Sequence, residues 1–160
     1  MKKIILMRHG EAETNKKDWD RCLSQTGKEE VSSVASQIIK YKNFSPQYVI
    51  CSEAQRTKET FEVFSSFHSV PPECCMFVES LYYGKISDVL NDMLKTPSEI
   101  ENLMIIGHNP LITELASKLS GKPLRLGTSD AVLLESEVDW ANILSNPWTC
   151  KTLISPSKKS

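Results

Sequence analysis

Residues 6–15 read LMRHGEAETN, and this stretch places two basic side chains directly behind an apolar run. Residues 4–7 contain no polar side chain, which is typical of a strand that is buried on both faces of a parallel sheet. The strand is predicted to end at Arg8, and His9 follows at once. Strands commonly end in uncharged turn residues. Two neighbouring side chains that can carry positive charge therefore raise the hypothesis that this strand end handles an anion.

Other segments extend the pattern to an α/β fold. Apolar runs predict further strands at residues 47–52, 75–78, 103–107, 131–136 and 150–155. Apolar residues at helical spacing predict helices from about residue 26, at 53–67, at 86–94 and from about residue 110 to 120. Thr26 and Glu29 have the spacing of a capping box, so Thr26 is predicted to start the first helix. Strands that alternate with helices indicate a three-layer α/β/α sandwich with a mostly parallel central sheet. No helix separates the last two strands, so one of them is a candidate antiparallel strand.

The composition is that of one ordinary globular domain. The chain has 160 residues, of which 40% are apolar and 24% charged, and its net charge is -1. We expect a single domain at residues 1–155 and a flexible tail at 156–160. A nucleic-acid surface would leave a basic excess, which this composition does not have, so no nucleic-acid partner is expected.

Short segments bear on localisation and redox state. The apolar run at the N-terminus stops at Arg8, before the roughly 7–15 apolar residues of a secretory signal are reached. No other stretch approaches the roughly 20 apolar residues of a membrane span, so we expect a cytoplasmic protein without a membrane partner. The 5 cysteines include no C-x-x-C pair, which argues against a zinc or redox site and favours reduced thiols.

Three of the predicted strands end in polar residues that could share one pocket. In open α/β sheets, ligands bind beyond the carboxyl ends of the strands. Arg8 and His9 follow the first strand. Ser52 ends the second strand, with Arg56 one helical turn further on, and His108 follows the fourth strand. Each residue alone could be an ordinary structural or solvated side chain, but the joint placement favours a compact cationic pocket.

A pocket with two arginines and two histidines suits a phosphoryl group. Guanidinium groups match phosphate oxygens in pairs, and Gly10 would let the backbone approach the anion closely. The sequence contains neither a Walker lysine loop nor a G-x-G-x-x-G fingerprint. Because no ligand spacing typical of a metal site is present, neither a metal nor a cofactor is expected.

Several motifs resemble the histidine phosphatase superfamily, also called the phosphoglycerate-mutase-like family. LMRHGEAETN resembles its Arg-His-Gly signature, CSEAQRTKET (51–60) the segment with its second phosphate-binding arginine, and IIGHNP (105–110) the segment with its second histidine. Within the family, DRCLSQTGKEE (20–30) is similar to the R-P-L-T-x-x-G stretch of the SixA-like phosphohistidine phosphatases, with Cys22 for proline and Ser24 for threonine. GTSDAVLLE (127–135) is similar to their Thr-Ser segment.

The resemblance implies a role for each candidate residue. It makes His9 the nucleophile that becomes phosphorylated, with Arg8, Arg56 and His108 binding the phosphoryl oxygens. It also implies that Asn15 contacts phosphate, whereas Asn15 could equally serve a turn. Arg21 could form an outer cationic rim or simply pair with Asp18 or Asp20. His108 would help most when protonated, while His9 must be neutral on its attacking nitrogen.

The general acid of larger family members has no clear counterpart in VESLYYG (78–84). The acid position falls on Tyr83, and Glu79 lies a few residues too early. A phosphoramidate depends less on a positioned acid than an ester does, because its leaving nitrogen can itself be protonated. The resemblance therefore implies a metal-independent phosphohistidine phosphatase. Its implied partner is a phosphorylated protein, such as a histidine-containing phosphotransfer domain, and phosphate or its mimics would bind in the pocket.

Two other functions remain open at this point. One is a phosphatase or mutase that acts on small phosphate esters, against which the doubtful acid argues. The other is a non-catalytic module that recognises phosphate, whose expected signature would be the loss of the nucleophile or of a phosphate-binding residue. Neither of those residues is missing from the sequence.

Overall fold

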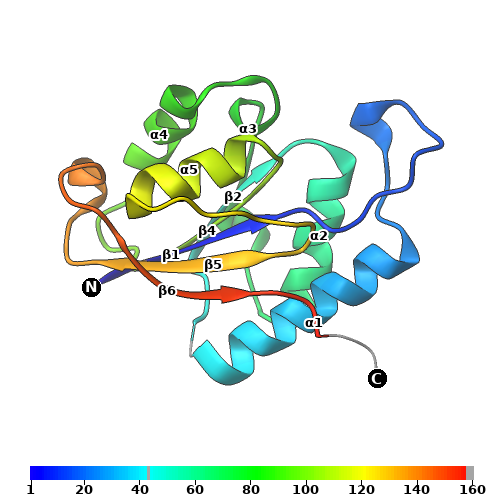
Figure 1. Ribbon diagram of the computed structural model, residues 1–160, viewed down its shortest axis with the longest axis horizontal. Coiled ribbons are helices and arrows are strands. Elements are labelled where there is room, and N and C mark those ends of the chain that lie inside the picture. The colour runs from blue at the N-terminus through cyan, green and yellow to red at the C-terminus, as the bar shows by residue number, and fades with distance from the viewer. Residues whose placement is uncertain (43, 158–160) are drawn as a thin grey trace.

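A six-stranded sheet forms the centre of the molecule (Figure 1). The computed structural model describes residues 1–42 and 44–157. The strands follow the order β3-β2-β4-β1-β5-β6 across the sheet. Their bounds are β1 Lys2–Arg8, β2 Tyr48–Ser52, β3 Cys75–Val78, β4 Asn102–Gly107, β5 Ala131–Ser136 and β6 Thr149–Ile154.

The strand directions give the sheet its mostly parallel character. β1, β2, β3 and β4 run parallel to one another, whereas β5 pairs antiparallel with β1 and β6 antiparallel with β5. The fold class expected from the sequence is confirmed, and β5 is the antiparallel strand that the missing crossover helix allowed. Two neighbouring parallel strands need a crossover of a dozen or more residues, usually an α-helix. The connection from β5 to β6 contains no helix longer than one turn.

Helices cover both faces of the sheet (Figure 1). α1 (Gln25–Lys42) and α2 (Gln55–Ser65) lie on one face. α4 (Ile86–Leu94) and α5 (Leu111–Ser120) lie on the other, together with the short α3 (Ser80–Tyr83). Helix α3 and three 3-10 turns were not predicted, because elements this short do not show a helical period of apolar residues. These turns are Asp18–Asp20, Pro72–Cys74 and Trp140–Asn142.

The apolar strands supply both halves of the core. Along β1, Ile4 and Leu6 pack under α4 and α5, while Ile5 and Met7 pack under α1 and α2. All four side chains are fully buried. Successive residues of a strand point to opposite faces, so an uninterrupted apolar run is what a sheet covered on both sides requires.

The start of α1 fixes the loop that leaves β1. The helix begins at Gln25, and Ser24 rather than Thr26 caps it, since the Gly27 N–H donates to Ser24 Oγ at 3.0 Å. A Cβ atom on Gly27 would lie 2.1 Å from the carbonyl oxygen of Glu11. The loop therefore crosses directly over the first turn of α1, in contact with its backbone.

The two ends of the chain complete the description. The Ser157 N–H donates to Ser33 Oγ of α1 at 2.9 Å, so the described start of the predicted tail lies against the helix. Residues 158–160 of that tail fall outside the described residues. No helix in the described ranges has the length and hydrophobicity needed to cross a bilayer.

Candidate active site

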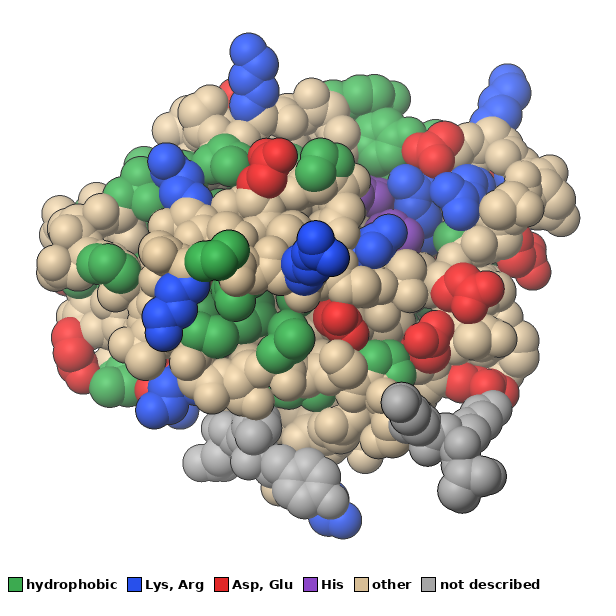
Figure 2. Space-filling view, viewed as in Figure 1, with side chains coloured by type: hydrophobic (Ala, Val, Ile, Leu, Met, Phe, Trp, Pro, Cys, Tyr) green, Lys and Arg blue, Asp and Glu red, His purple; other side chains and the backbone are tan. Residues whose placement is uncertain are grey.

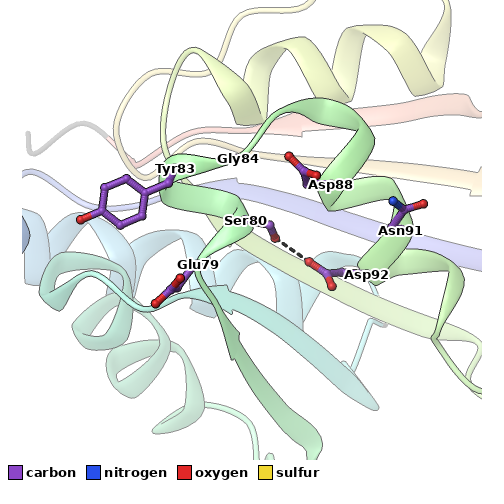
Figure 3. A pocket seen from close by; sticks show the side chains of 7 residues that line it. All are labelled: Glu79, Ser80, Tyr83, Gly84, Asp88, Asn91 and Asp92. Atoms are coloured by element: carbon purple, nitrogen blue, oxygen red, sulfur yellow. Dashed lines mark hydrogen bonds between the residues drawn. The ribbon is translucent and has the colours of Figure 1, made fainter.

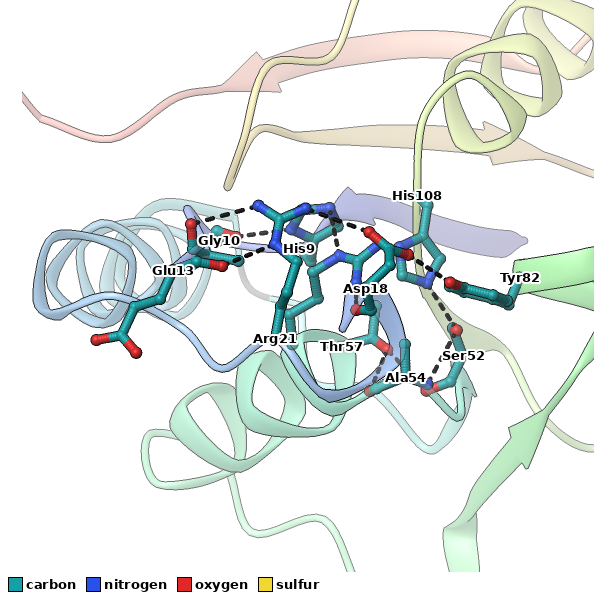
Figure 4. A network of polar contacts seen from close by, with 12 residues as sticks. His9, Gly10, Glu13, Asp18, Arg21, Ser52, Ala54, Thr57, Tyr82 and His108 are labelled. Carbon is teal, nitrogen blue, oxygen red and sulfur yellow. Dashed lines mark hydrogen bonds and ion pairs between the residues drawn. The ribbon is translucent and has the colours of Figure 1, made fainter. Parts of the chain in front are cut away.

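Two histidines meet where three parallel strands end. β2, β4 and β1 are neighbours in the sheet, so their carboxyl ends lie side by side. His9 follows β1 and His108 follows β4, and their ring centroids are 5.2 Å apart with an interplanar angle of 54° (Figure 4). The two imidazoles therefore lie together at the strand ends, as the sequence predicted, and both are buried.

His9 is held in one orientation by its own backbone neighbour. Its Nδ1 lies 2.7 Å from the Gly10 carbonyl oxygen, so Nδ1 carries the proton and donates to that oxygen. Nε2 then keeps a lone pair, which accepts a hydrogen bond from Arg56 Nε at 3.3 Å. Burial lowers the pKa of His9 to about 4, and the Gly10 carbonyl opposes this shift while Arg56 adds to it. A neutral imidazole with an unprotonated nitrogen is the form that can attack phosphorus.

His108 is also neutral near pH 7. Burial lowers its pKa to about 3, and His9 and Arg56 lower it further. Its Nε2 lies 2.7 Å from Ser52 Oγ at the end of β2. Its buried Nδ1 has no hydrogen-bond partner among the described residues. The sequence suggested a protonated His108. In the structure His108 is neutral, and an incoming anion would have to raise its pKa before it could take up a proton.

The two arginines come from different elements. Arg8 is the last residue of β1, and its Nη1 donates to the Leu126 carbonyl oxygen at 3.4 Å. Its buried Nε has no partner in the described part of the chain. Arg56 lies in the first turn of α2 and is 6% exposed. Both guanidinium groups act on the pKa of His9, so the four predicted residues do form one cluster.

The turn from β2 into α2 sets the position of Arg56. Ser52 Oγ accepts the Ala54 N–H at 3.3 Å, and Thr57 Oγ1 lies 2.8 Å from the carbonyl oxygens of both Ser52 and Ala54. These side-chain bonds satisfy backbone groups at the helix start, as capping residues do. Thr57 is fully buried in this structural role.

Asp18 is the residue that sequence reasoning did not bring to the site. The Asp18 carbonyl oxygen accepts Arg56 Nη1 at 2.7 Å, and its carboxylate Oδ2 accepts Arg56 Nη2 at 3.2 Å. The hydroxyl of Tyr82 donates to the same Oδ2 (Figure 4). The Tyr82 hydroxyl and then Arg56 lower the pKa of Asp18 to about 2, against a smaller opposing effect of burial. The carboxylate is therefore ionised at neutral pH.

The remaining predicted residues lie around this cluster. Arg21 makes the ion pair that the sequence offered as the alternative to a cationic rim, since its Nη1 lies 3.3 Å from Asp18 Oδ1. Its Nε donates to the Glu13 carbonyl oxygen at 2.7 Å. Asn15 lies exposed in the loop, and no described hydrogen bond joins it to the imidazoles or the arginines. The Gly10 N–H donates to Thr60 Oγ1 at 3.1 Å, and a Cβ added to Gly10 would lie 2.8 Å from Val31 Cγ2, so packing alone already requires a glycine here.

The region after β3 contributes Tyr82. Its ring packs edge-on against His108 with centroids 5.2 Å apart, and Arg56 Cζ lies 5.9 Å from its centroid. Tyr83, which the sequence placed at the acid position, is 73% exposed and stacks on Trp19 instead. Glu79 is exposed and lines a separate hollow with Asp88 and other residues of α3 and α4 (Figure 3). That hollow is acidic and does not suit a phosphate.

The Thr-Ser segment closes the other side of the site. The Ser129 N–H donates to the His9 carbonyl oxygen at 3.0 Å, and the Arg8 N–H donates to the Asp130 carbonyl oxygen at 3.0 Å. Ser129 has a left-handed φ of 65° and is fully buried, and its Oγ has no described partner. Three unpartnered buried polar atoms thus belong to residues in or against one cluster: Arg8 Nε, His108 Nδ1 and Ser129 Oγ. Such a concentration is uncommon in stable interiors and typical of a site that receives a polar ligand.

The site is open to the outside. Figure 2 shows histidine side chains visible at the surface, with Lys and Arg side chains gathered around them. Within the described ranges, no group of three His, Cys, Asp or Glu side chains could hold a metal ion. The cluster offers fixed cations and a neutral nucleophilic nitrogen, which together can bind and transfer a phosphoryl group.

Comparison with known proteins agrees with this chemistry. A sequence profile of the histidine phosphatase superfamily (branch 1) matches residues 4–99. The chain belongs to the histidine phosphatase superfamily. This membership makes it a phosphatase, and the motifs at Arg8 and Arg56 lie inside the matched segment. An uncharacterized chloroplastic protein of Arabidopsis thaliana is 31% identical, over 97% of this chain and 78% of that protein.

Solved structures of SixA proteins share the fold of this superfamily member. A phosphohistidine phosphatase SixA from Nakamurella multipartitia superimposes with a TM-score of 0.87 at 18% identity, covering 98% of this chain and 97% of that one. A protein histidine phosphatase SixA in complex with tungstate gives a TM-score of 0.83 at 22% identity, covering 96% and 97%. At these identities the likeness establishes the fold, and the SixA-like resemblance of the sequence is confirmed at that level.

Proposed function

We propose that the protein removes the phosphoryl group from a phosphohistidine on another protein, through a phosphohistidine formed on His9. The observation that carries the proposal is the geometry of His9, whose Nδ1–H is bound to the Gly10 carbonyl and whose Nε2 faces Arg56. This geometry keeps Nε2 unprotonated, and Nε2 could attack once a phosphoryl group takes over the Arg56 N–H that it now accepts.

The reaction divides into two transfers. In the first, the Nε2 lone pair of His9 forms a bond to phosphorus while the substrate's N–P bond breaks and its electron pair returns to the leaving imidazole. In the second, water attacks the phosphorus, the bond to Nε2 breaks, and the water proton leaves with phosphate or passes to solvent. Arg8, Arg56 and a His108 protonated by the approaching anion would stabilise the charge on the phosphoryl oxygens in both steps.

The surroundings of the pocket support a phosphoramidate over an ester. An alkoxide leaving group needs a nearby acid that is protonated at neutral pH. The carboxyl group in the described site is that of Asp18, whose pKa is lowered to about 2, and it cannot fill that role. Glu79 is exposed and lines the separate acidic hollow. These observations argue against a phosphatase or mutase that acts on small phosphate esters.

The openness of the site supports a protein substrate. A phosphorylated histidine projects from its protein on a short side chain, so its phosphoryl group can reach only a pocket that is accessible from outside. Figure 2 shows histidine side chains at the molecular surface, with Lys and Arg side chains beside them. A histidine-containing phosphotransfer domain is the partner that we propose.

The deciding experiment uses a phosphotransfer protein that carries radioactive phosphate on its histidine. We expect the wild type to release phosphate and to acquire transient acid-labile label, and we expect His9→Ala to do neither. His68→Gln serves as the matched control, because His68 is buried and stacks on Phe64, outside the site. Binding of phosphate without any label or turnover would instead favour a non-catalytic recognition module, and faster turnover of a sugar or glycerate phosphate would favour an ester phosphatase.

A further inference from the structure

The mouth of the pocket has a composition that the phosphoryl group alone does not require. An anion site gains from cations, yet the ionised carboxylate of Asp18 lies directly against Arg56. This carboxylate weakens the positive potential that a phosphate would meet. A carboxylate at this place is better suited to bind the part of the substrate that does not carry the phosphoryl group.

The Tyr82 side chain lies beside the carboxylate, and Trp19 packs against Tyr82. The ring of Tyr82 packs edge-on against Trp19, with centroids 4.7 Å apart, and the Tyr82 hydroxyl donates to Asp18. The same Tyr82 ring lies against His108, so it borders the catalytic cluster on one side and Trp19 on the other. A carboxylate beside aromatic faces is the combination that recognises a flat organic cation.

Space for such a group exists beside His108. Tyr82, His108 and Pro110 help to line a groove of about 420 Å³, whose lining does not include Asp18. This volume falls within the range of small-molecule sites, which is roughly 300–1,000 Å³. A ring at the Tyr82 end of this groove would lie next to the phenol whose hydroxyl binds Asp18. The Asp18 carboxylate is itself 55% exposed, and a carboxylate has about four acceptor positions, so its contacts with Arg21, Arg56 and Tyr82 leave it able to bind one further donor.

We propose that Asp18, together with the ring of Tyr82, recognises the imidazole ring of the substrate in its cationic form. Asp18 is then a specificity-determining residue of the reaction, and this inference rests on the proposed function. An imidazole ring titrates near neutral pH, so a phosphorylated ring can carry a proton on its second nitrogen. That N–H donates to the Asp18 carboxylate. When the N–P bond breaks, its electron pair returns to the ring, which leaves as neutral imidazole without needing an acid.

The charges of the site are compatible with this arrangement. Arg8, Arg56 and Arg21 surround the pocket, and Asp18 offsets one of these three charges. A phosphoryl group brings roughly two negative charges at neutral pH. With phosphate bound, the fixed cations are balanced, and a protonated ring meets the carboxylate without net repulsion.

The test compares two substrates that differ in the leaving group. Phosphoimidazole carries the ring alone, and p-nitrophenyl phosphate has an aromatic leaving group without an N–H. We expect Asp18→Asn to lower kcat/KM for phosphoimidazole by about tenfold or more, as loss of a charged hydrogen bond does. Because the Asp18 carboxylate also holds Arg56, we expect the same variant to lower kcat/KM for p-nitrophenyl phosphate as well, but by a clearly smaller factor, so that the ratio of the two kcat/KM values falls. Asp20→Asn is the matched control, because Asp20 lies in the same 3-10 turn and its carboxylate makes no described contact with Arg56.

Each other outcome has a definite meaning. Equal losses of kcat/KM for both substrates, which leave the ratio of the two values unchanged, would overturn the inference and assign Asp18 only to positioning Arg56. A wild type that dephosphorylates the phosphotransfer protein but ignores phosphoimidazole would remove the ring subsite and leave the proposed function intact. A wild type inactive toward both would end the two proposals together.

Discussion

Arg56 Nε lies 3.3 Å from His9 Nε2, although 47 residues separate the two along the chain. The contact joins the end of β1 to the first turn of α2, and it places a permanent positive charge at the nitrogen that the proposed reaction uses. The same guanidinium extends its two Nη atoms to Asp18. One side chain therefore connects the nucleophile with the mouth of the pocket.

Replacing Arg56 tests whether the shape of its guanidinium matters as well as its charge. Arg56→Lys keeps the charge but loses the planar fork that can hold two phosphoryl oxygens. We expect kcat/KM for the phosphoprotein to fall by about 10²–10³, as after removal of one transition-state donor. Arg125→Lys makes the same change at an exposed arginine outside the cluster and should have little effect. Near wild-type turnover in Arg56→Lys would contradict the role given to the fork.

The two lowered histidine pKa values predict acid sensitivity. His9 and His108 titrate at about 4 and about 3 in the folded protein, below the ordinary value of 6.5. The unfolded chain therefore binds protons that the folded chain does not, and the stabilisation is complete above pH 6.5 and lost as pH falls toward 4. At pH 5 the loss is about 2 kcal/mol for each ring relative to pH 8. Urea titrations should show a smaller pH dependence for His108→Gln than for the wild type, and equal dependences would refute the assignment.

Binding of an oxyanion should bring a proton with it. A negative group beside His108 favours the charged imidazole and raises its pKa, and the unpartnered Nδ1 gives the anion a donor to approach. We expect tungstate binding to take up protons at pH 5.5 and fewer at pH 8. Calorimetry in buffers of different ionisation enthalpy measures this uptake. In His108→Gln the uptake should shrink, and an undiminished uptake would place the proton elsewhere.

Gly10 is predicted not to tolerate replacement by a larger residue, because its surroundings are closely packed. An added Cβ would lie 2.8 Å from Val31 Cγ2 and 3.0 Å from the Gly27 carbonyl oxygen. Gly10→Ala should therefore lower the free energy of unfolding by about 1–3 kcal/mol and displace the loop that carries His9. Adding Val31→Ala removes the nearer contact, so the double variant should be less destabilised than the sum of the two single variants. Additive losses in a double-mutant cycle would rule out this clash.

The sequence predicted the strands and the four clustered residues for one physical reason. Apolar runs define buried strands, and parallel strands bring their carboxyl ends to one edge of the sheet. Residues that follow such strands, such as His9 and His108, must then come close whatever the intervening chain does. The predicted bounds of most helices and strands differ from the observed ones by one or two residues.

The contacts of Asp18 and Tyr82 could not be predicted in this way. Asp18 lies in a loop whose course is set by its packing on α1 and by an isolated bridge between Ala12 and Leu23, and these contacts leave no periodic signal. Tyr82 and Tyr83 are neighbours on a helix, where successive side chains differ by about 100° in direction. Which of these two rings contacts His108 therefore depends on the exact start of the helix, which has no signal in the sequence pattern. The neutral state of His108 depends on burial, which only the folded arrangement determines.

The order of strands also governs when the protein can first act during its synthesis. β1 and β2 are not neighbours, because β4 lies between them and pairs with both. Until residues 102–107 have emerged from the ribosome and inserted, the groups on the first two strands have no common partner to align them. We therefore expect a nascent chain that already contains Arg8, His9 and Arg56 to lack an aligned site until that central strand is in place.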